Sequence, residues 1–215
     1  MNSNQNLDHK TLKRILYLIE QAGSLMLLPR THIKHLGNSF DNIASHSYQV
    51  AVVAYCISRM EHLTHEEALQ SVGMAIFHDL SEARTGDLDF IAKHYATVDE
   101  NKAVQDQLKG VPFSSEIKVL IDEYNHKRNN IAICARDADS LVQFYTQWVL
   151  MWQGNQLAKK WYDSDFNDRI PGLKTESARH LALALKDSNP NEWWWSQFLE
   201  NDAAIEKDKL LGKDD

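Results

Sequence analysis

Glycine and proline are scarce in this chain, which has 8 Gly and 4 Pro among its 215 residues. Folds built from short strands need these residues at their many tight turns, so a mainly β architecture is disfavoured. Nearly every long segment instead repeats apolar residues at the spacing of an amphipathic helix. No internal repeat or low-complexity linker divides the chain. We therefore predict an all-α fold, a helical bundle that forms a single domain.

Basic blocks and long apolar runs are also missing. The formal net charge is −7, and no cluster of Lys and Arg offers the phosphate contacts that give affinity for nucleic-acid polymers. No apolar run approaches the roughly 20 residues needed to cross a bilayer, and the polar start, residues 1–10, lacks the layout of a secretory signal. We expect neither a nucleic-acid polymer nor a membrane as partner, and a cytoplasmic location. A small anionic ligand remains compatible with this composition.

Cysteine is nearly absent as well. The two cysteines, Cys56 and Cys134, fall inside apolar helical stretches and form no spaced framework. This placement predicts buried, reduced thiols and not a disulfide.

Apolar periodicity predicts the helices one by one. The first spans Leu12 to Ile19 with Gly23 placed to end it, and a polar loop follows from Pro29 to Ala44. Thr64 with Glu67 three residues later has the spacing of a capping box, which predicts a helix that leads into residues 78–79. Other helices are expected at 45–60, 117–124, 131–152, 175–187 and 191–200, with two shorter ones between 87 and 109. The charged residues 206–215 are expected to fray.

Four potential metal ligands occur in helical segments that otherwise reject polar groups: His46, His78, Asp79 and Asp139. A buried carboxylate without a partner costs several kcal/mol, so the two Asp side chains need cations, hydrogen bonds or a metal ion. Two imidazoles favour the metal. Two nitrogen and two oxygen donors would leave positions open for water and substrate on one divalent ion, which could be Mn, Co, Fe, Zn or Mg.

Glu82 and Asp87 follow the second pair of candidate ligands. Glu82 is four residues after His78 and three after Asp79, so a continuing helix would place its carboxylate beside both. A carboxylate that is not itself a ligand can deprotonate a water molecule acidified by the ion. Gly86 can relax the backbone so that residues 87–89 turn over the mouth of the site.

This set of motifs resembles the HD-domain superfamily of metal-dependent phosphohydrolases. Its order of one His, a His-Asp doublet and a distant Asp is met by His46, His78-Asp79 and Asp139. The surroundings are similar to the 5′-deoxynucleotidase (YfbR-like) branch in the segments LPRT (28–31), NIASHS (42–47), HDLSEA (78–83), TGDL (85–88) and RDADSL (136–141). We assign residues 1–205 to one HD phosphohydrolase domain, with a motif core at about 27–145, C-terminal helices at 154–205 and a charged tail at 206–215.

The resemblance implies an HD-domain helical bundle, usually dimeric, that releases phosphate from 2′-deoxynucleoside 5′-monophosphates with one divalent cation. Carried over by position, Arg30 would orient the phosphate and Glu82 would be the catalytic carboxylate, with Asp87 in support. The remaining substrate contacts implied in this way are Thr31, Asp79, Asp87, Leu88, Asp89, Phe90 and Asp139. Thr31-His32 stands where that branch has an aromatic residue, so the resemblance leaves sugar and base preference open.

Other functions and simpler structural roles remain open at this stage. The same metal site could remove triphosphate from a dNTP or act on a cyclic or alarmone nucleotide, with Arg84 and Lys93 as candidates for holding extra phosphates. A noncatalytic nucleotide-sensing module is a further alternative.

Some of these residues could have purely structural roles. Arg30 could pair with Asp41 on the surface. Solvated or packing roles are expected for His32, His35, His94, His126 and His180, and a helix-packing or dimer surface for Trp193, Trp194 and Trp195.

Overall fold

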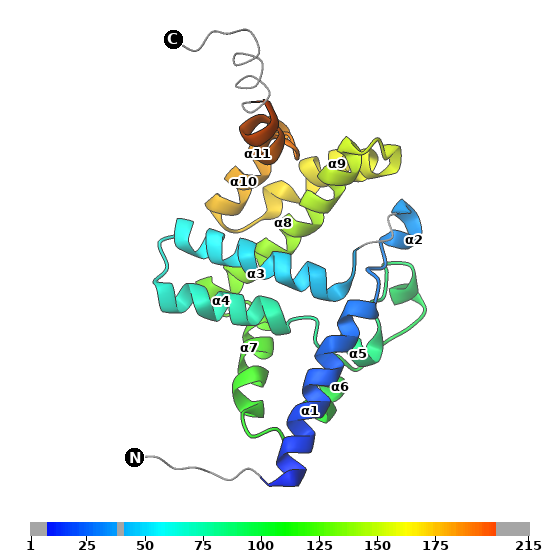
Figure 1. Ribbon diagram of the computed structural model, residues 1–215, viewed down its shortest axis with the longest axis vertical. Coiled ribbons are helices and arrows are strands. Elements are labelled where there is room, and N and C mark those ends of the chain that lie inside the picture. Colours follow the sequence, from blue (N-terminus) through cyan, green and yellow to red (C-terminus); the bar gives the residue numbers. More distant parts are fainter. Residues whose placement is uncertain (1–7, 38–40, 201–215) are drawn as a thin grey trace, which may run out of the picture.

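The computed structural model describes residues 8–37 and 41–200, and within these ranges every regular element is helical (Figure 1). An isolated β-bridge between Pro29 and Asn42 is the one extended pairing there. The α-helices are α1 His9–Ser24, α2 Ile33–Leu36, α3 Ile43–Met60, α4 His65–Phe77, α5 Glu82–Thr85, α6 Glu100–Leu108, α7 Ser114–His126, α8 Asn130–Trp152, α9 Gln156–Asp168, α10 Glu176–Lys186 and α11 Glu192–Trp194. Short 3-10 turns lie at Leu25–Leu27, Ala92–His94 and Ile170–Gly172, and Trp195–Glu200 forms a π-helix.

Three helices, α3, α4 and α8, form the centre of the bundle (Figure 1). In α3, Ile43, Val50, Ala54 and Ile57 are fully buried, because α4 and α8 pack on different sides of this helix. The main core continues through α8 to Phe144 and to the helices that follow it. The all-α, single-domain prediction is confirmed, and the three central helices are the ones that contain or precede the candidate ligands.

Side-chain caps define where two of these helices begin. The Thr64 side chain accepts a hydrogen bond from the Glu67 N–H while the Glu67 carboxylate accepts one from the Thr64 N–H, which confirms the predicted capping box. A second capping box joins Asn42, the residue before α3, to Ser45 in the first turn of this helix. His46 directly follows Ser45. Such caps stabilise a protein by about 0.5–2 kcal/mol each.

Several local predictions were wrong. Helix α4 ends at Phe77, and residues 78–81 form a turn before α5, so no continuous helix joins His78 to Glu82. The expected loop at 29–44 contains the one-turn helix α2. The segment 191–200 is helical as predicted, with a short α-helix followed by a π-helix. Cys56 is exposed, contrary to the prediction, while Cys134 is buried as expected.

None of the described helices combines the length and the apolar character needed to cross a lipid bilayer. The predicted charged tail, residues 206–215, lies outside the described residues.

Candidate metal centre

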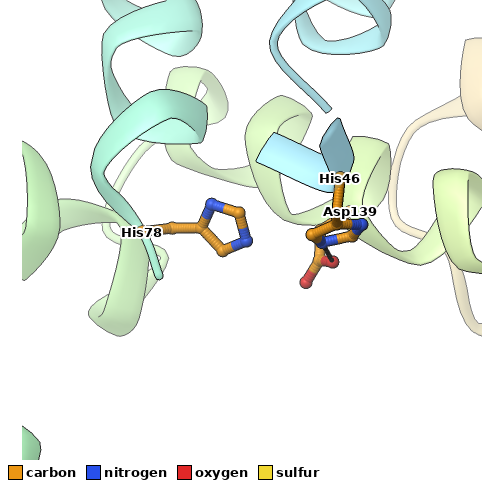
Figure 2. Close-up of side chains that lie close together, drawn as sticks. All are labelled: His46, His78 and Asp139. Atoms are coloured by element: carbon orange, nitrogen blue, oxygen red, sulfur yellow. Dashed lines mark ion pairs between the residues drawn. The ribbon is translucent and has the colours of Figure 1, made fainter. Parts of the chain in front are cut away.

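Three separate elements bring His46, His78 and Asp139 together. His46 lies in the first turns of α3, His78 directly follows α4, and Asp139 lies in the middle of α8. Each offers one ligand atom, and the three atoms lie within 4.8 Å of one another. Figure 2 shows His78 reaching from one side toward His46 and Asp139, whose nitrogen Nε2 and oxygen Oδ1 are 3.1 Å apart. The two imidazoles are almost fully buried, with 3% of each side chain exposed.

Asp79 lies beside the same cluster. Its Oδ2 atom is 3.0 Å from His78 Nε2 and 3.9 Å from His46 Nε2. All four side chains that the sequence singles out as metal ligands therefore gather at one place in the bundle, although they come from distant parts of the chain.

The donor set fits a divalent cation. Both imidazole Nε2 atoms are buried and lack a hydrogen bond of good geometry within the described part of the chain, although carboxylate oxygens lie 3.0–3.1 Å away. Such separations are what two ligand atoms show when each is about 2.1 Å from the same ion. Burial lowers the pKa of His78, but the charges of Asp79 and Asp139 outweigh this and raise it to about 9. The cluster thus favours a positive charge here, which a bound cation would supply.

Outer contacts fix the orientation of these donors. His78 Nδ1 lies 2.6 Å from the Ala75 carbonyl oxygen, which can only accept a hydrogen bond, so Nδ1 donates and Nε2 is left facing the cluster. The Tyr124 hydroxyl donates to Asp139 Oδ2 at 2.9 Å, and its ring packs on His78 with a centroid separation of 4.9 Å. The Arg136 guanidinium lies 4.7 Å from the Tyr124 ring centroid.

Tyr124 is a site residue that the sequence patterns did not indicate beyond its place in the helix expected at 117–124. A tyrosine in a buried helical stripe needs a partner for its hydroxyl, and this requirement was the available signal. The partner itself could not be identified without knowing how α7 packs against α8.

Asp137 and Asp139 are two residues apart in α8 and serve different purposes. Asp137 Oδ2 accepts hydrogen bonds from the Lys174 N–H at 2.8 Å and from the Thr175 N–H at 2.6 Å, so it anchors the start of α10. Asp139 faces the histidines. Burial raises the pKa of Asp139, yet hydrogen bonding and the neighbouring charges of His46 and His78 hold it well below its usual value.

Glu82 lies at the edge of the cluster, placed there by the turn 78–81. Its backbone N–H donates to the Asp79 carbonyl at 3.0 Å, and its Oε2 atom is buried without a hydrogen-bond partner among the described residues. Burial, followed by the charges of Asp79 and Asp87, raises the pKa of Glu82 to about 8. A carboxyl group with this pKa can take up a proton near neutral pH.

Arg30 points toward the cluster and not toward the surface. Its Nη1 atom lies 3.4 Å from Asp79 Oδ2, while Asp41 pairs instead with His32, whose Nε2 is 3.2 Å away. The Arg30 Nε atom is buried and has no hydrogen-bond partner in the described structure. This guanidinium therefore has a donor available for an anion at the mouth of the cluster.

The segment 87–90 lies against the loop that follows Arg30. Asp87 Oδ2 accepts hydrogen bonds from the Thr31 N–H at 2.9 Å and the Thr31 hydroxyl at 3.0 Å. Asp89 accepts from the Ala92 N–H at 2.7 Å and from Lys34 at 3.1 Å, and these contacts lower its pKa to about 2. Asp87 and Asp89 thus hold the two loops together in this structure.

The other candidates for substrate contact are dispersed. Leu88 and Phe90 line a cavity beside the metal cluster, and Lys93 lines it as well. Arg84 is directed elsewhere, since its Nε donates to Gln21 at 2.6 Å. The tryptophans at 193–195 are not part of this cavity: Trp193 and Trp195 are exposed, and Trp194 packs edge-on against Trp195.

An all-helical bundle in which buried His and half-buried Asp donors converge on one point, next to an arginine and a glutamate, has the architecture of a metal-dependent hydrolase. The chain belongs to the HD-domain family, because the family's sequence profile, described as an HD domain, matches residues 22–171.

Individual relatives agree with this assignment. The chain is 36% identical over 83 residues to a 5′-deoxynucleotidase of Shewanella oneidensis, which covers 37% of this chain and 40% of that protein. It is 29% identical over 121 residues to a 5′-deoxynucleotidase of Erwinia tasmaniensis. This match covers 48% of this chain and 58% of that protein. These matches span only about half the length of the relatives. A solved structure described as a predicted metal-dependent phosphohydrolase from Magnetospirillum magnetotacticum shares the fold, with a TM-score of 0.62 at 18% identity over 83% of this chain and 95% of that one.

Proposed function

We propose that the protein is a 5′-nucleotidase that releases phosphate from 2′-deoxynucleoside 5′-monophosphates with the help of one divalent cation. The observation that supports this most is the juxtaposition of four potential ligands with Glu82 and Arg30 on their open side. Both partial relatives named above are 5′-deoxynucleotidases, which favours this substrate class over other phosphate esters.

In this proposal His46, His78, Asp79 and Asp139 hold the cation. When bound, a divalent ion would acidify water and offset the negative charge that develops on the phosphate. The four side chains supply two neutral nitrogens and two carboxylates, which suits Mn, Co, Fe, Zn or Mg to different degrees. Their burial keeps solvent from the protein side of the site.

Glu82 and Arg30 have complementary roles in the proposed reaction. Glu82 takes a proton from the attacking water, because its carboxylate lies beside the proposed ligands and its Oε2 atom has no hydrogen-bond partner among the described residues. Arg30 binds two phosphate oxygens through its planar guanidinium and orients the phosphorus for attack. Water adds to phosphorus as Glu82 takes its proton, the bond from phosphorus to the 5′ oxygen breaks, and the leaving 5′ oxygen takes up a proton to become the nucleoside hydroxyl. The nucleoside and inorganic phosphate then leave.

Asp87 and Thr31 have a positioning role in this proposal. Their mutual hydrogen bonds tie the loop after Arg30 to the segment after Glu82, so the two reactive side chains keep a fixed relation. Leu88 and Phe90 then border the sugar side of the substrate. Asp89 holds the segment 87–90 in place through its contacts with Lys34 and His35 of α2.

A phosphate-release assay tests the proposal. Purified protein is reconstituted separately with each divalent cation and offered deoxynucleoside mono- and triphosphates, ribonucleotides, cyclic nucleotides and an alarmone. We expect inorganic phosphate from deoxynucleoside monophosphates, and none from the Glu82→Gln variant. Release of triphosphate would favour the dNTP alternative, and absence of any hydrolysis with metal bound would favour a nucleotide-sensing module. The homodimer and the cytoplasmic location expected from the sequence remain predictions.

A further inference from the structure

A cavity of about 430 Å³ lies next to the proposed reaction site, between the segment 88–93, the residues around α2, and helices α8 and α9. Two of its lining residues connect it to the site: Thr31 directly follows Arg30, and Leu88 directly follows Asp87. We propose that this cavity binds the nucleobase of the substrate and that Gln147 recognises an N–H group of the base. The identity of the ligand as substrate rests on the proposed function.

Gln147 presents a buried acceptor that no group of residues 8–37 or 41–200 satisfies. The side chain lines the cavity, the residue is 2% exposed, and its Nε2 donates to Asp165 Oδ2 at 2.8 Å. A carboxylate can only accept, so this bond fixes which end of the amide is the oxygen. The Oε1 atom is buried and has no hydrogen-bond partner in the described part of the chain. Such an atom is costly unless a ligand donates to it.

The same cavity has aromatic surfaces suited to a planar ring. The centroid of the His35 ring is 5.8 Å from that of Phe90 and 6.0 Å from that of Trp161. Phe90 is 63% exposed, which leaves much of its ring free for contact. Bases stack on aromatic side chains irrespective of their identity, because every base has a π-face.

These two features together select the chemistry of the ligand. Stacking surfaces alone would accept any planar group, and an unpaired acceptor alone would accept any donor or a water molecule. A heterocycle that carries an N–H at its edge satisfies both. A nucleoside 5′-phosphate could place its phosphate near Arg30 and such a base beyond Thr31 and Leu88, with the sugar between them.

Binding of two nucleosides to the full-length protein tests this inference without requiring hydrolysis. 2′-Deoxyadenosine carries an exocyclic amino group, whereas purine 2′-deoxyriboside has the same ring system with no N–H on the base. By isothermal titration calorimetry we expect 2′-deoxyadenosine to bind about tenfold more tightly, because the analogue leaves the buried Gln147 oxygen unpaired. Equal affinities, or no binding of either nucleoside, would overturn the inference.

Substitutions test whether Gln147 causes the difference in affinity between the two nucleosides. Gln147→Met should abolish the difference between the two nucleosides. Gln70→Met is a matched control, since Gln70 also donates to a carboxylate, Glu123 at 3.3 Å, but lies outside the cavity, and it should preserve the difference. If Gln147→Met does not fold, Phe90→Leu on the surface should weaken both nucleosides while keeping their ratio. Retention of the difference in folded Gln147→Met would also refute the inference.

Activity measurements separate this inference from the proposed function. If the 5′-monophosphates of both nucleosides are hydrolysed with equal kcat/KM, the nucleotidase proposal stands and the base-binding role of the cavity falls. If the nucleosides bind with the expected preference but no monophosphate is hydrolysed, the cavity stands as a nucleoside site and the proposed function falls.

Discussion

Glu82→Gln should stabilise the cation-free protein while removing its activity. The ordinary pKa of a glutamate is 4.5 and that of Glu82 in the folded chain is about 8, raised mainly by burial. Between these values the folded state binds more protons than the unfolded state, so the stability contributed by Glu82 is complete below about pH 4.5 and is lost as pH rises toward 8. Each pKa unit corresponds to about 1.4 kcal/mol, so the loss between pH 6 and pH 8 is about 2 kcal/mol.

The glutamine variant lacks this proton, so its stability relative to the wild type should grow by about 2 kcal/mol over the same range. Urea denaturation in the presence of a chelator, at pH 6 and pH 8, measures both proteins. Other groups such as His78, whose pKa is also raised, lose stability in the same direction in both proteins, so the difference between the two proteins reports mainly on Glu82. A difference that does not change with pH would refute the assignment of a raised pKa to Glu82.

The activity of the same variant completes the test. Loss of a general base typically lowers turnover by 10²- to 10⁴-fold, so kcat of Glu82→Gln should fall by at least about 100-fold while the protein still binds metal. Glu116→Gln, at an exposed position of α7, is the matched control and should retain wild-type kcat. A Glu82→Gln variant with normal turnover would exclude the proposed role.

Four further outcomes follow from the structure. His78→Ala should lose the bound cation, measured as metal content after dialysis; a full complement of metal would argue against His78 as a ligand. Tyr124→Phe should weaken cation affinity about tenfold, by titration, because Asp139 loses its orienting hydrogen bond. Arg30→Lys should lower kcat/KM by about 10- to 100-fold through loss of paired phosphate contacts, whereas Arg84→Lys should not. Asn42→Ala should reduce unfolding free energy by about 1 kcal/mol in denaturation experiments, because α3 loses its cap.

Sequence patterns predicted the helices better than the connections between them. The capping box at Thr64 and the apolar stretch of α3 predicted elements that the structure contains at nearly those positions, since both depend on local spacing. The end of α4 at Phe77 was not predicted, because nothing in the sequence around His78 breaks a helix. The exposed position of Cys56 was missed for a related reason: a helix that is apolar on nearly all sides does not show which side stays uncovered.

The candidate site was predictable as a set of residue types and not as a geometry. His46, His78, Asp79 and Asp139 stood out because polar groups are costly in apolar helices, and their convergence depends on how α3, α4 and α8 cross. The hydrogen bond from Tyr124 and the cavity lined by Gln147 both depend on the packing of helices far apart in sequence. Helical periodicity contains no information about such packing.

The convergence of the metal donors from three helices has a consequence for the lifetime of the protein. An ion that binds only when α3, the end of α4 and α8 have docked has little affinity for unfolded chains, so its binding free energy adds to the stability of the whole bundle. Cation supply would then set how often the bundle opens to proteases. In a metal-starved cell, the enzyme would be degraded as well as inactive.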